Sequence, residues 1–202
     1  DYDDDIFCVP EIAHRSVHNR RNYYQTEHLP INWILSDPKG YISMIKDVQD
    51  ANSSFRPTTI LLKEWRRSLK EIHGDEFQLK SFHMELIVAE LATNDTSADC
   101  LTLSAQFFEK LIPYYIAQKP LFQDRANPDG FIDDYEISDK CLGILQKHTT
   151  RGRLIIEKIR SAESESEVAS LIEELINTAP KYDTYVTSTH KPHKPHASYV
   201  IE

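Results

Sequence analysis

Apolar residues recur at intervals of three and four along most of the sequence, and this spacing predicts a mainly α protein. Ser36-Asp37-Pro38 supplies an N-cap and a proline in the first turn, so we expect a helix over about residues 37–51. Pro57 is expected to open the next helix. The apolar stripe of that helix is predicted to consist of Leu61, Trp65, Leu69 and Ile72.

The second half of the chain continues this pattern. Residues 81–92 are apolar nearly all round, which is typical of a buried central helix. A further helix is expected to end near Pro113, and residues 124–130 are rich in turn formers. Residues 134–160 are predicted to be helical, with an interruption near Gly152. The last helix should begin at Ser164, because Ser164 and Glu167 fit a capping box.

One stretch favours a strand. Residues 5–12 form a short apolar run with a proline near its end, which suits a strand end or edge. Residues 13–30 are polar and predict a loop. Five or six helices, one strand and no repeat period indicate an irregular helical bundle with a remnant of a β-strand at the N-terminus.

Composition narrows the class of protein. A length of 202 residues with 40% hydrophobic content is enough for one domain with a real core. The formal net charge of −9 argues against strong nonspecific binding of nucleic acid, because such binding neutralises phosphates with Lys and Arg. No apolar run reaches the roughly 18 residues of a membrane span. The three cysteines, Cys8, Cys100 and Cys141, lack metal-ligand spacing and suit reduced, structural thiols, so we expect a soluble, cytoplasmic protein without a membrane partner.

Two neighbouring segments could bind an anion. Opposite the apolar stripe, the helix after Pro57 has a cationic face made of Lys63, Arg66, Arg67 and Lys70. Ser81 is expected to be the N-cap of the next helix, among free backbone N–H groups where the helix dipole also favours negative charge. Phe82 offers a ring on which a base could stack. Plainer interpretations stay open, because cationic helix faces are commonly just solvated and Phe82 could pack in the core.

Three further residues are expected to be structural. Trp65 belongs to the apolar stripe and should be in the core. His83 lies in the buried helix, where a lone histidine is more often hydrogen-bonded than catalytic. Glu85 could cap the helix or pair with a nearby base.

Carboxylates and histidines at the two ends of the sequence could bind metals. Asp1, Asp3 and Asp5 alternate, so an extended chain would place three carboxylates on one face. Mg²⁺ prefers carboxylate and phosphate oxygens, so this arrangement suits phosphoryl or nucleotidyl transfer, although an acidic, frayed terminus has the same sequence. Near the other end, a Pro-rich tail that is expected to be extended could bind a metal weakly through His190, His193 and His196.

Two motifs carry a resemblance to a known superfamily. Leu61-Leu62-Lys63-Glu64-Trp65, followed by Ser81-Phe82-His83-Met84-Glu85-Leu86, resembles the helical domain of the nucleotidyltransferases that include oligoadenylate synthetase, cyclic GMP-AMP synthase and the bacterial cyclic-oligonucleotide synthases of antiviral defence. Trp33-Ile34-Leu35-Ser36-Asp37-Pro38 is similar to the W-x-x-[ST]-[DN]-P that enters the first helix of that domain. The turn at 124–128 before a long helical hairpin is similar as well, so the resemblance covers about residues 31–178.

The resemblance implies roles for individual residues. Lys63 matches the lysine that holds nucleotide phosphates, Ser81 the residue that touches the triphosphate, and Phe82 the aromatic that stacks on the base, while Arg66 and Arg67 lie on the same cationic face. The family's catalysis uses a palm domain in which a Gly-Ser loop and acidic residues bind two Mg²⁺. In this sequence Asp3 and Asp5 would be the catalytic acids, and the metal ligands would be Asp1, Asp3 and Asp5.

The sequence has no Gly-Ser loop, so we expect this chain alone to lack a full palm and its partner to be a missing N-terminal catalytic part. The resulting prediction is a Mg²⁺-dependent nucleotidyltransferase that joins nucleoside triphosphates into a cyclic or linear oligonucleotide signal. Residues 1–30 would be a palm remnant, 31–180 the helical nucleotide-binding domain, and 181–202 a flexible Pro/His-rich tail. Two alternatives stay open: a non-catalytic nucleotide-sensing or partner-binding module, and an RNA-binding helical domain.

Overall fold

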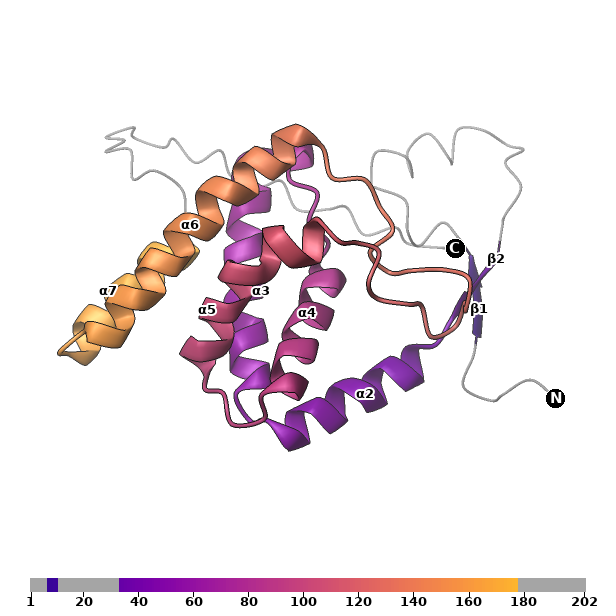
Figure 1. Ribbon diagram of the computed structural model, residues 1–202, viewed down its shortest axis with the longest axis horizontal. Coiled ribbons are helices and arrows are strands. Elements are labelled where there is room, and N and C mark those ends of the chain that lie inside the picture. Colours follow the sequence, from indigo (N-terminus) through magenta and orange to yellow (C-terminus); the bar gives the residue numbers. More distant parts are fainter. Residues whose placement is uncertain (1–6, 11–32, 178–202) are drawn as a thin grey trace, which may run out of the picture.

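The structure, a computed structural model, describes residues 7–10 and 33–177 and is mainly α, as predicted (Figure 1). Asp1, Asp3, Asp5, the predicted loop and the His-rich tail lie outside the described residues. In the described part, six α-helices form an irregular bundle, and a two-stranded sheet lies at the N-terminal end of α2. The elements in order are β1 (Phe7–Pro10), β2 (Trp33–Ser36), α2 (Pro38–Ala51), α3 (Phe55–His73), α4 (Ser81–Asn94), α5 (Cys100–Lys110), α6 (Asp139–Ser161) and α7 (Glu165–Ile176).

The sheet confirms the predicted strand and adds one that the sequence did not predict. β1 falls within the expected run of residues 5–12 and pairs antiparallel with β2, from Phe7 opposite Ser36 to Pro10 opposite Trp33. The prediction of a single strand was therefore wrong. β2 has only four residues and runs almost directly into α2 through Asp37, so it is too short to show an alternating pattern.

α4 lies at the centre of the bundle, as its all-round apolar sequence predicts. It packs against α2, α3 and α5. Its buried side chains are His83, Met84, Leu86, Ile87, Val88, Ala89, Leu91 and Ala92. Figure 1 shows α4 beside α3 and α5, and its buried side chains run from His83 to Ala92, so most of its length belongs to the core.

α3 buries a different stripe from the one predicted. Ile72 is 40% exposed and Leu61 is half-buried, whereas Thr58, Thr59 and Leu62 are buried beside the predicted Trp65 and Leu69. The reason is that α3 packs two threonines inward. The hydroxyl of Thr58 donates to the carbonyl of Ser54 at 2.7 Å, so its burial leaves no unpaired donor. The helix also begins at Phe55, two residues before Pro57.

Trp65 is fully buried, which confirms its assignment to the core. Its ring contacts three phenylalanines edge-on. The ring centroids lie 5.2 Å from Phe108, 6.1 Å from Phe107 and 6.5 Å from Phe77. Edge-to-face contacts of this kind stabilise aromatic clusters beyond the area they bury, so α3 and α5 are joined through these rings.

Pro113 does not end the helical path, contrary to the prediction. The chain continues beyond α5 as a π-helix over Leu111–Ile116 that contains Pro113. Within it the N–H of Ala117 donates to the carbonyl of Ile112, five residues earlier. Proline has no N–H to donate, and the wider π turn accommodates that gap without ending the helix.

α6 is continuous through Gly152, so the predicted interruption is absent. A Cβ atom at this position would lie 2.7 Å from the ring of Phe108 on α5, which is closer than real Cβ contacts. Gly152 therefore lets α5 and α6 approach closely. α6 also begins at 139 rather than 134, because the side chain of Ser138 caps it by accepting from the N–H of Cys141.

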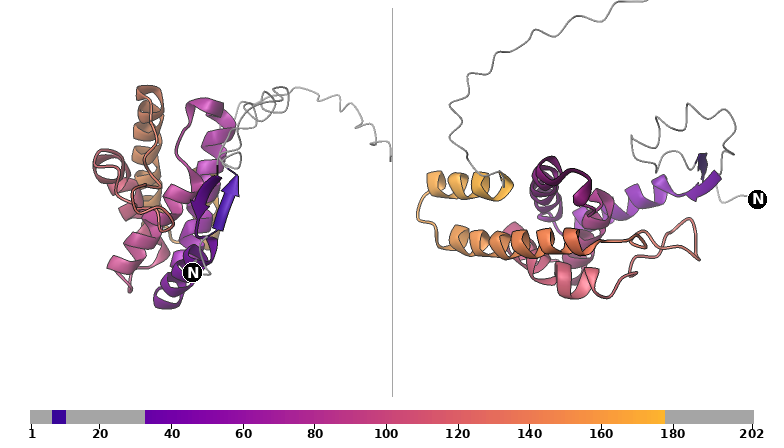
Figure 2. Two further views of the ribbon diagram at one scale, coloured as in Figure 1. Left: turned by 90° about the vertical axis from the view of Figure 1, so that its right-hand side faces the viewer. Right: turned by 90° about the horizontal axis from the view of Figure 1, so that it is seen from above.

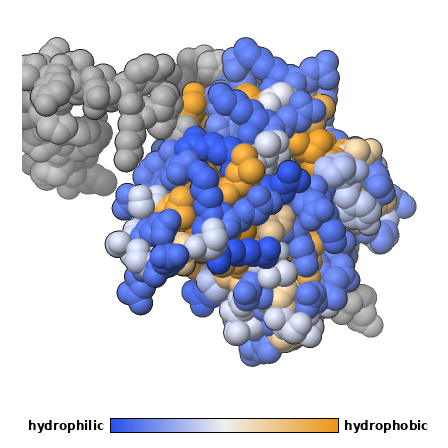
Figure 3. All heavy atoms as spheres, turned by 60° about the vertical axis from the view of Figure 1, so that its left-hand side comes forward, coloured by the Kyte–Doolittle hydropathy of each residue, from blue (hydrophilic) through white to orange (hydrophobic). Residues whose placement is uncertain are grey.

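α7 runs back along α6 (Figure 2). Ser164 caps it by accepting from the N–H of Glu167 at 3.2 Å, as predicted. The carboxylate of Glu167 reaches the N–H of Glu163 instead of that of the cap residue. On the face that brings α6 and α7 forward, hydrophilic residues predominate and hydrophobic ones form small separate groups (Figure 3).

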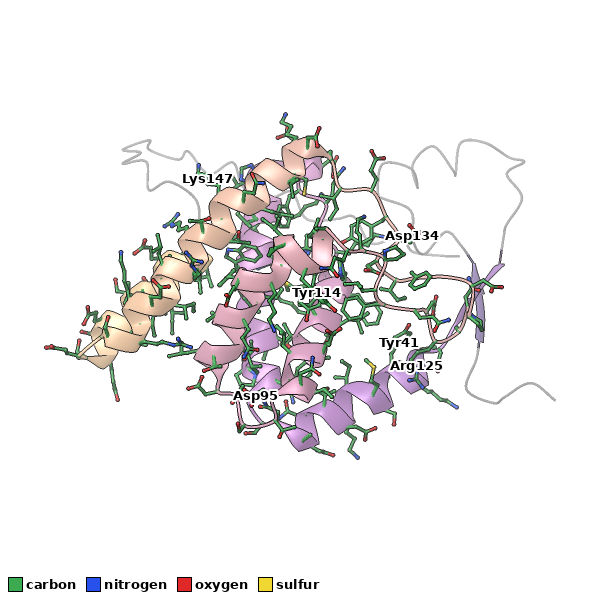
Figure 4. All side chains as sticks on the ribbon, viewed as in Figure 1. Tyr41, Asp95, Tyr114, Arg125, Asp134 and Lys147 are labelled. Carbon is green, nitrogen blue, oxygen red and sulfur yellow. The ribbon has the colours of Figure 1, made fainter. Side chains whose placement is uncertain are left out.

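The connector between the π-helix and α6 is turn-rich at residues 124–130, as predicted, and it is fixed to the start of α2. The hydroxyl of Tyr41 accepts from the N–H of Arg125 at 3.1 Å and lies 3.3 Å from a carboxylate oxygen of Asp124. The guanidinium of Arg125 pairs with Asp37, the N-cap of α2, at 3.1 Å. Figure 4 shows Tyr41 and Arg125 side by side, so α2 and the connector form one surface.

Candidate functional site

A groove of about 550 Å³ lies between α2 and α3, with α4 at its edge. Pockets of about 300–1,000 Å³ are typical of sites for small organic ligands. Most of the lining is apolar, and the basic side chains come from both helices. The lining residues are Ile42, Ile45, Lys46, Gln49, Phe55, Arg56, Thr59, Ile60, Lys63 and Glu85.

Lys63 lies on the lining of this groove and joins α3 to α4. Its ammonium nitrogen is 2.8 Å from a carboxylate oxygen of Glu85, as expected of a base near that acid. The two side chains are 37% and 21% exposed. An ion pair that is partly open to solvent contributes little to stability, so both charges are available to a ligand at modest cost.

Ser81 lies one helical turn before Glu85, on the same side of α4. It is the first residue of the helix, and the N-cap is Lys80, which has no side-chain capping bond. The prediction that Ser81 is the N-cap was therefore wrong. The chain is turned into the helix one residue earlier because the backbone N–H of Lys80 donates to the hydroxyl of Tyr135 at 3.1 Å.

Phe82 packs against α2. Its ring meets that of Tyr41 edge-on, with centroids 4.9 Å apart. Phe82 is half-buried, so part of its surface stays open beside the start of α4. Tyr41 is also the residue that binds the connector, so the ring of Phe82, α2 and the connector meet at one place.

The predicted cationic face of α3 divides into two kinds of residue. Arg67 is exposed and pairs with Glu64 and Glu71, and Lys70 pairs with Asp75. Arg66 is half-buried, and its Nε donates to the carbonyl of Leu79 at 2.6 Å, just before α4 begins. Burial lowers the pKa of the Arg66 guanidinium, and the nearby Tyr135 opposes that shift. The groove is lined by Lys63, whereas Arg66 and Arg67 lie outside its lining.

The sequence did not predict the contacts of His83, near the start of α4, with two polar side chains of the connector, Tyr135 and Asp133. Nδ1 of His83 lies 2.8 Å from the Tyr135 hydroxyl, which already accepts from the N–H of Lys80. Which of these two atoms donates depends on the tautomer of His83. The other ring nitrogen, Nε2, lies 3.9 Å from Asp133, whose carboxylate accepts from two backbone N–H groups, those of Leu121 and Phe122.

This arrangement is structural rather than nucleophilic. Burial lowers the pKa of His83 to about 4, with Asp133 opposing the shift and two lysines adding to it. Burial likewise raises the pKa of Tyr135 to about 12, so its hydroxyl stays protonated. The expectation that His83 is a hydrogen-bonded core histidine is confirmed. Tyr135 and Asp133 lie in a connector with no periodicity, so the sequence carried no signal for them.

The described residues contain no group of three or more His, Cys, Asp or Glu side chains that could hold a metal ion. The predicted metal ligands and catalytic acids, Asp1, Asp3 and Asp5, lie outside this part of the chain. Likewise, none of the described helices is both long and apolar enough to cross a membrane.

The chain shares its fold with CdnC of Escherichia coli MS115-1, and this confirms the mainly α fold expected from the resemblance. The chain matches Escherichia coli MS115-1 CdnC in its complex with HORMA-deltaN with a TM-score of 0.57 and 18% identity, over 76% of this chain and 56% of that chain. It matches CdnC with ATP with a TM-score of 0.54 and 18% identity, over 72% and 52%. The match thus spans little more than half of CdnC. No protein-family model and no curated protein matches the sequence.

Proposed function

We propose that residues 31–180 are the helical nucleotide-binding domain of a nucleotidyltransferase that joins nucleoside triphosphates into a cyclic or linear oligonucleotide signal. The shared fold with CdnC supports this proposal, and one of the matching structures is CdnC with ATP. The observation that carries it is the position of Lys63. This residue lines the groove and pairs with Glu85, which lies one helical turn after Ser81 on α4.

In this proposal the groove receives a nucleoside triphosphate. Its volume suits a ligand of that size, and basic residues from α2 and α3 lie around an apolar floor. The ammonium of Lys63 binds a phosphate by exchanging the carboxylate of Glu85 for a more highly charged anion. Ser81 supplies a hydroxyl near the first turn of α4, where backbone N–H groups favour negative charge. Phe82 supplies the ring for the base.

For the residues that the structure describes, the proposal covers only binding of the triphosphate. The described residues supply no site for Mg²⁺, so we assign no step to a metal. The two-metal chemistry expected from Asp1, Asp3 and Asp5, and an N-terminal catalytic part as partner, belong to the same proposal for the whole protein. A role in antiviral defence is proposed from the superfamily resemblance, and a cytoplasmic location from the three cysteines of the sequence, which suit reduced thiols.

The test is a titration of ATP, in the presence and absence of Mg²⁺, into the wild-type chain and Lys63→Ala. Loss of one phosphate contact from a cation is expected to weaken binding at least about tenfold. Lys70→Ala is the matched control, because Lys70 lies on the same helix, pairs with Asp75 and is outside the groove. Equal affinities of wild type and Lys63→Ala would reject the role of Lys63.

A second candidate is a non-catalytic module that binds a partner protein. It is favoured by the exposure of two isoleucines on the groove, Ile42 at 70% and Ile60 at 56%. One CdnC structure is a complex with a HORMA protein, which shows that the fold can carry a protein partner. No measurable ATP binding by the wild-type chain would favour this candidate over the first.

A further inference from the structure

Most cations of α3 are neutralised by carboxylates. Lys63 pairs with Glu85, Arg67 with Glu64 and Glu71, and Lys70 with Asp75. In a chain with 32 acidic and 23 basic residues, a cation meets a carboxylate readily. Cations that gather without one are therefore informative.

Lys80 and Lys119 form such a group. Their ammonium nitrogens lie 4.2 Å and 4.9 Å from the centroid of one ring, that of Tyr135, so both charges lie against the same side chain. Neither forms an ion pair with any residue of the described part. Lys119 donates to the carbonyl of Tyr135, and Lys80 is exposed.

The acidic residues nearby do not neutralise this pair. Asp133 is buried and accepts from two backbone N–H groups, so its carboxylate is already used. Asp134 and Glu136 flank Tyr135 in sequence and are exposed, but neither makes an ion pair within the described residues. The pKa of the Lys80 ammonium is lowered, first by burial and then by the charge of Lys119.

A third cation lies near this pair. The guanidinium of Arg66 uses one donor on the carbonyl of Leu79, the residue before Lys80. Its remaining N–H groups have no carboxylate partner in the described part. Three charges of one sign thus lie near the first turn of α4, two of them against the ring of Tyr135. A cation–π contact stabilises each lysine by only about 0.5–1 kcal/mol at an exposed site, which leaves their charges uncompensated.

We propose that Lys80, Lys119 and Arg66 form a second anion site, which takes a phosphate or pyrophosphate group. An anion that contacts both lysines offsets their mutual repulsion and accepts a charge-assisted hydrogen bond from each. Arg66 supplies further donors from the side of α3. This site uses neither Lys63 nor the α2–α3 groove, so it stands even if the groove does not bind a nucleotide.

The experiment is a calorimetric titration of inorganic pyrophosphate into the wild-type chain at low salt and at two higher salt concentrations. The wild type is expected to bind, with an affinity that falls as salt rises. Lys80→Gln/Lys119→Gln should lose at least about tenfold in affinity, since each substitution removes one charge-assisted bond. Lys80→Arg/Lys119→Arg, which keeps both charges, should stay within a few-fold of the wild type.

Two controls distinguish this site from the groove and from a general effect of net charge. Lys147→Gln/Lys158→Gln changes the net charge by the same amount at exposed positions of α6, and it should bind like the wild type. In a Lys63→Ala background, which removes the phosphate-binding lysine of the groove, Lys80→Gln/Lys119→Gln should still lose at least about tenfold in affinity for pyrophosphate. Failure of the wild type to bind would overturn the proposal, as would an unchanged affinity after Lys80→Gln/Lys119→Gln in either background. Unchanged thermal unfolding of the double variants confirms that they fold.

Discussion

Lys63 on α3 and Glu85 on α4 form an ion pair of 2.8 Å on the lining of the α2–α3 groove. The pair joins the two central helices, yet both side chains remain partly open to solvent. Glu85 therefore competes with any anionic ligand for the charge of Lys63. Removing the carboxylate of Glu85 should therefore change the affinity for an anionic ligand, and this change can be measured.

Glu85→Gln is expected to strengthen ATP binding, because it releases Lys63 from its carboxylate. A partly exposed ion pair is worth about 0.2–1 kcal/mol, so the gain is up to about fivefold in affinity. Glu71→Gln, which removes a carboxylate paired with Arg67 outside the groove, should leave ATP affinity unchanged. Weaker ATP binding by Glu85→Gln would contradict competition between the two anions.

Gly152→Ala is expected to destabilise the protein, although alanine favours a helix by up to about 1 kcal/mol over glycine. The new methyl group would press on the ring of Phe108, which is held by Trp65 and Phe107, and overpacking of this kind costs about 1–3 kcal/mol. We expect a lower free energy of unfolding in urea.

Gly143→Ala is the matched control on the same helix. A Cβ atom there has no neighbour within 4 Å, so the helix preference acts alone and the variant should be as stable as the wild type or more so. Equal gains in stability from both substitutions would show that the ring of Phe108 moves aside for the new methyl group at no cost in free energy.

Stability should fall as the pH is lowered from about 6.5 to 4. Burial lowers the pKa of His83 and of His148 from 6.5 to about 4, and for His148 the neighbouring His73 adds to the shift. In this window the unfolded chain takes up protons that the folded chain does not, which favours unfolding. Each histidine contributes up to about 1.4 kcal/mol per pH unit.

Urea unfolding at pH 7.5, 6 and 5 measures this dependence. His148→Gln is expected to be less pH-dependent than the wild type, because it removes one of the two titrating groups. Lys158→Gln, at an exposed position of the same helix, should keep the wild-type slope. If the free energy of unfolding of His148→Gln depended on pH as strongly as that of the wild type, His148 would have the same pKa in the folded and the unfolded chain.

Asp133→Ala is expected to lower stability by about 2–4 kcal/mol. The carboxylate is fully buried and accepts from the N–H groups of Leu121 and Phe122 at 2.8 and 3.0 Å, and removing it leaves both donors unpaired. Asp133→Asn keeps one acceptor and should cost less. Asp134→Ala changes an exposed neighbour and should stay within about 0.5 kcal/mol of the wild type in thermal unfolding.

Local signals in the sequence predicted several elements well. The helix at 37–51, the buried helix from 81 and the Ser164 cap depend on residues within a few positions of one another, so caps and periodicity suffice. The inward threonines of α3 and the turn at Pro113 depend on packing against other helices. A pattern of apolar and polar residues does not encode that packing.

The candidate site also contains contacts that the sequence could predict and one that it could not. Lys63 and Glu85 are 22 residues apart on two helices that were both predicted. Their pairing could therefore be expected from the sequence. The start of α4 is fixed by Tyr135, which lies 55 residues after Lys80 in an irregular connector. That contact moved the cap from Ser81 to Lys80, and no local rule contains it.

The burial of α4 on nearly every side restricts how ligand preference can change in this fold. Substitutions along the middle of the helix alter the core and lower stability, whatever they do to a ligand. Recognition can therefore diversify at the first turn of α4, at the half-buried Glu85, and in the connector around Tyr135 without remodelling the bundle. The middle of α4 is therefore fixed by the core, whereas substitutions near its first turn can change which ligand binds.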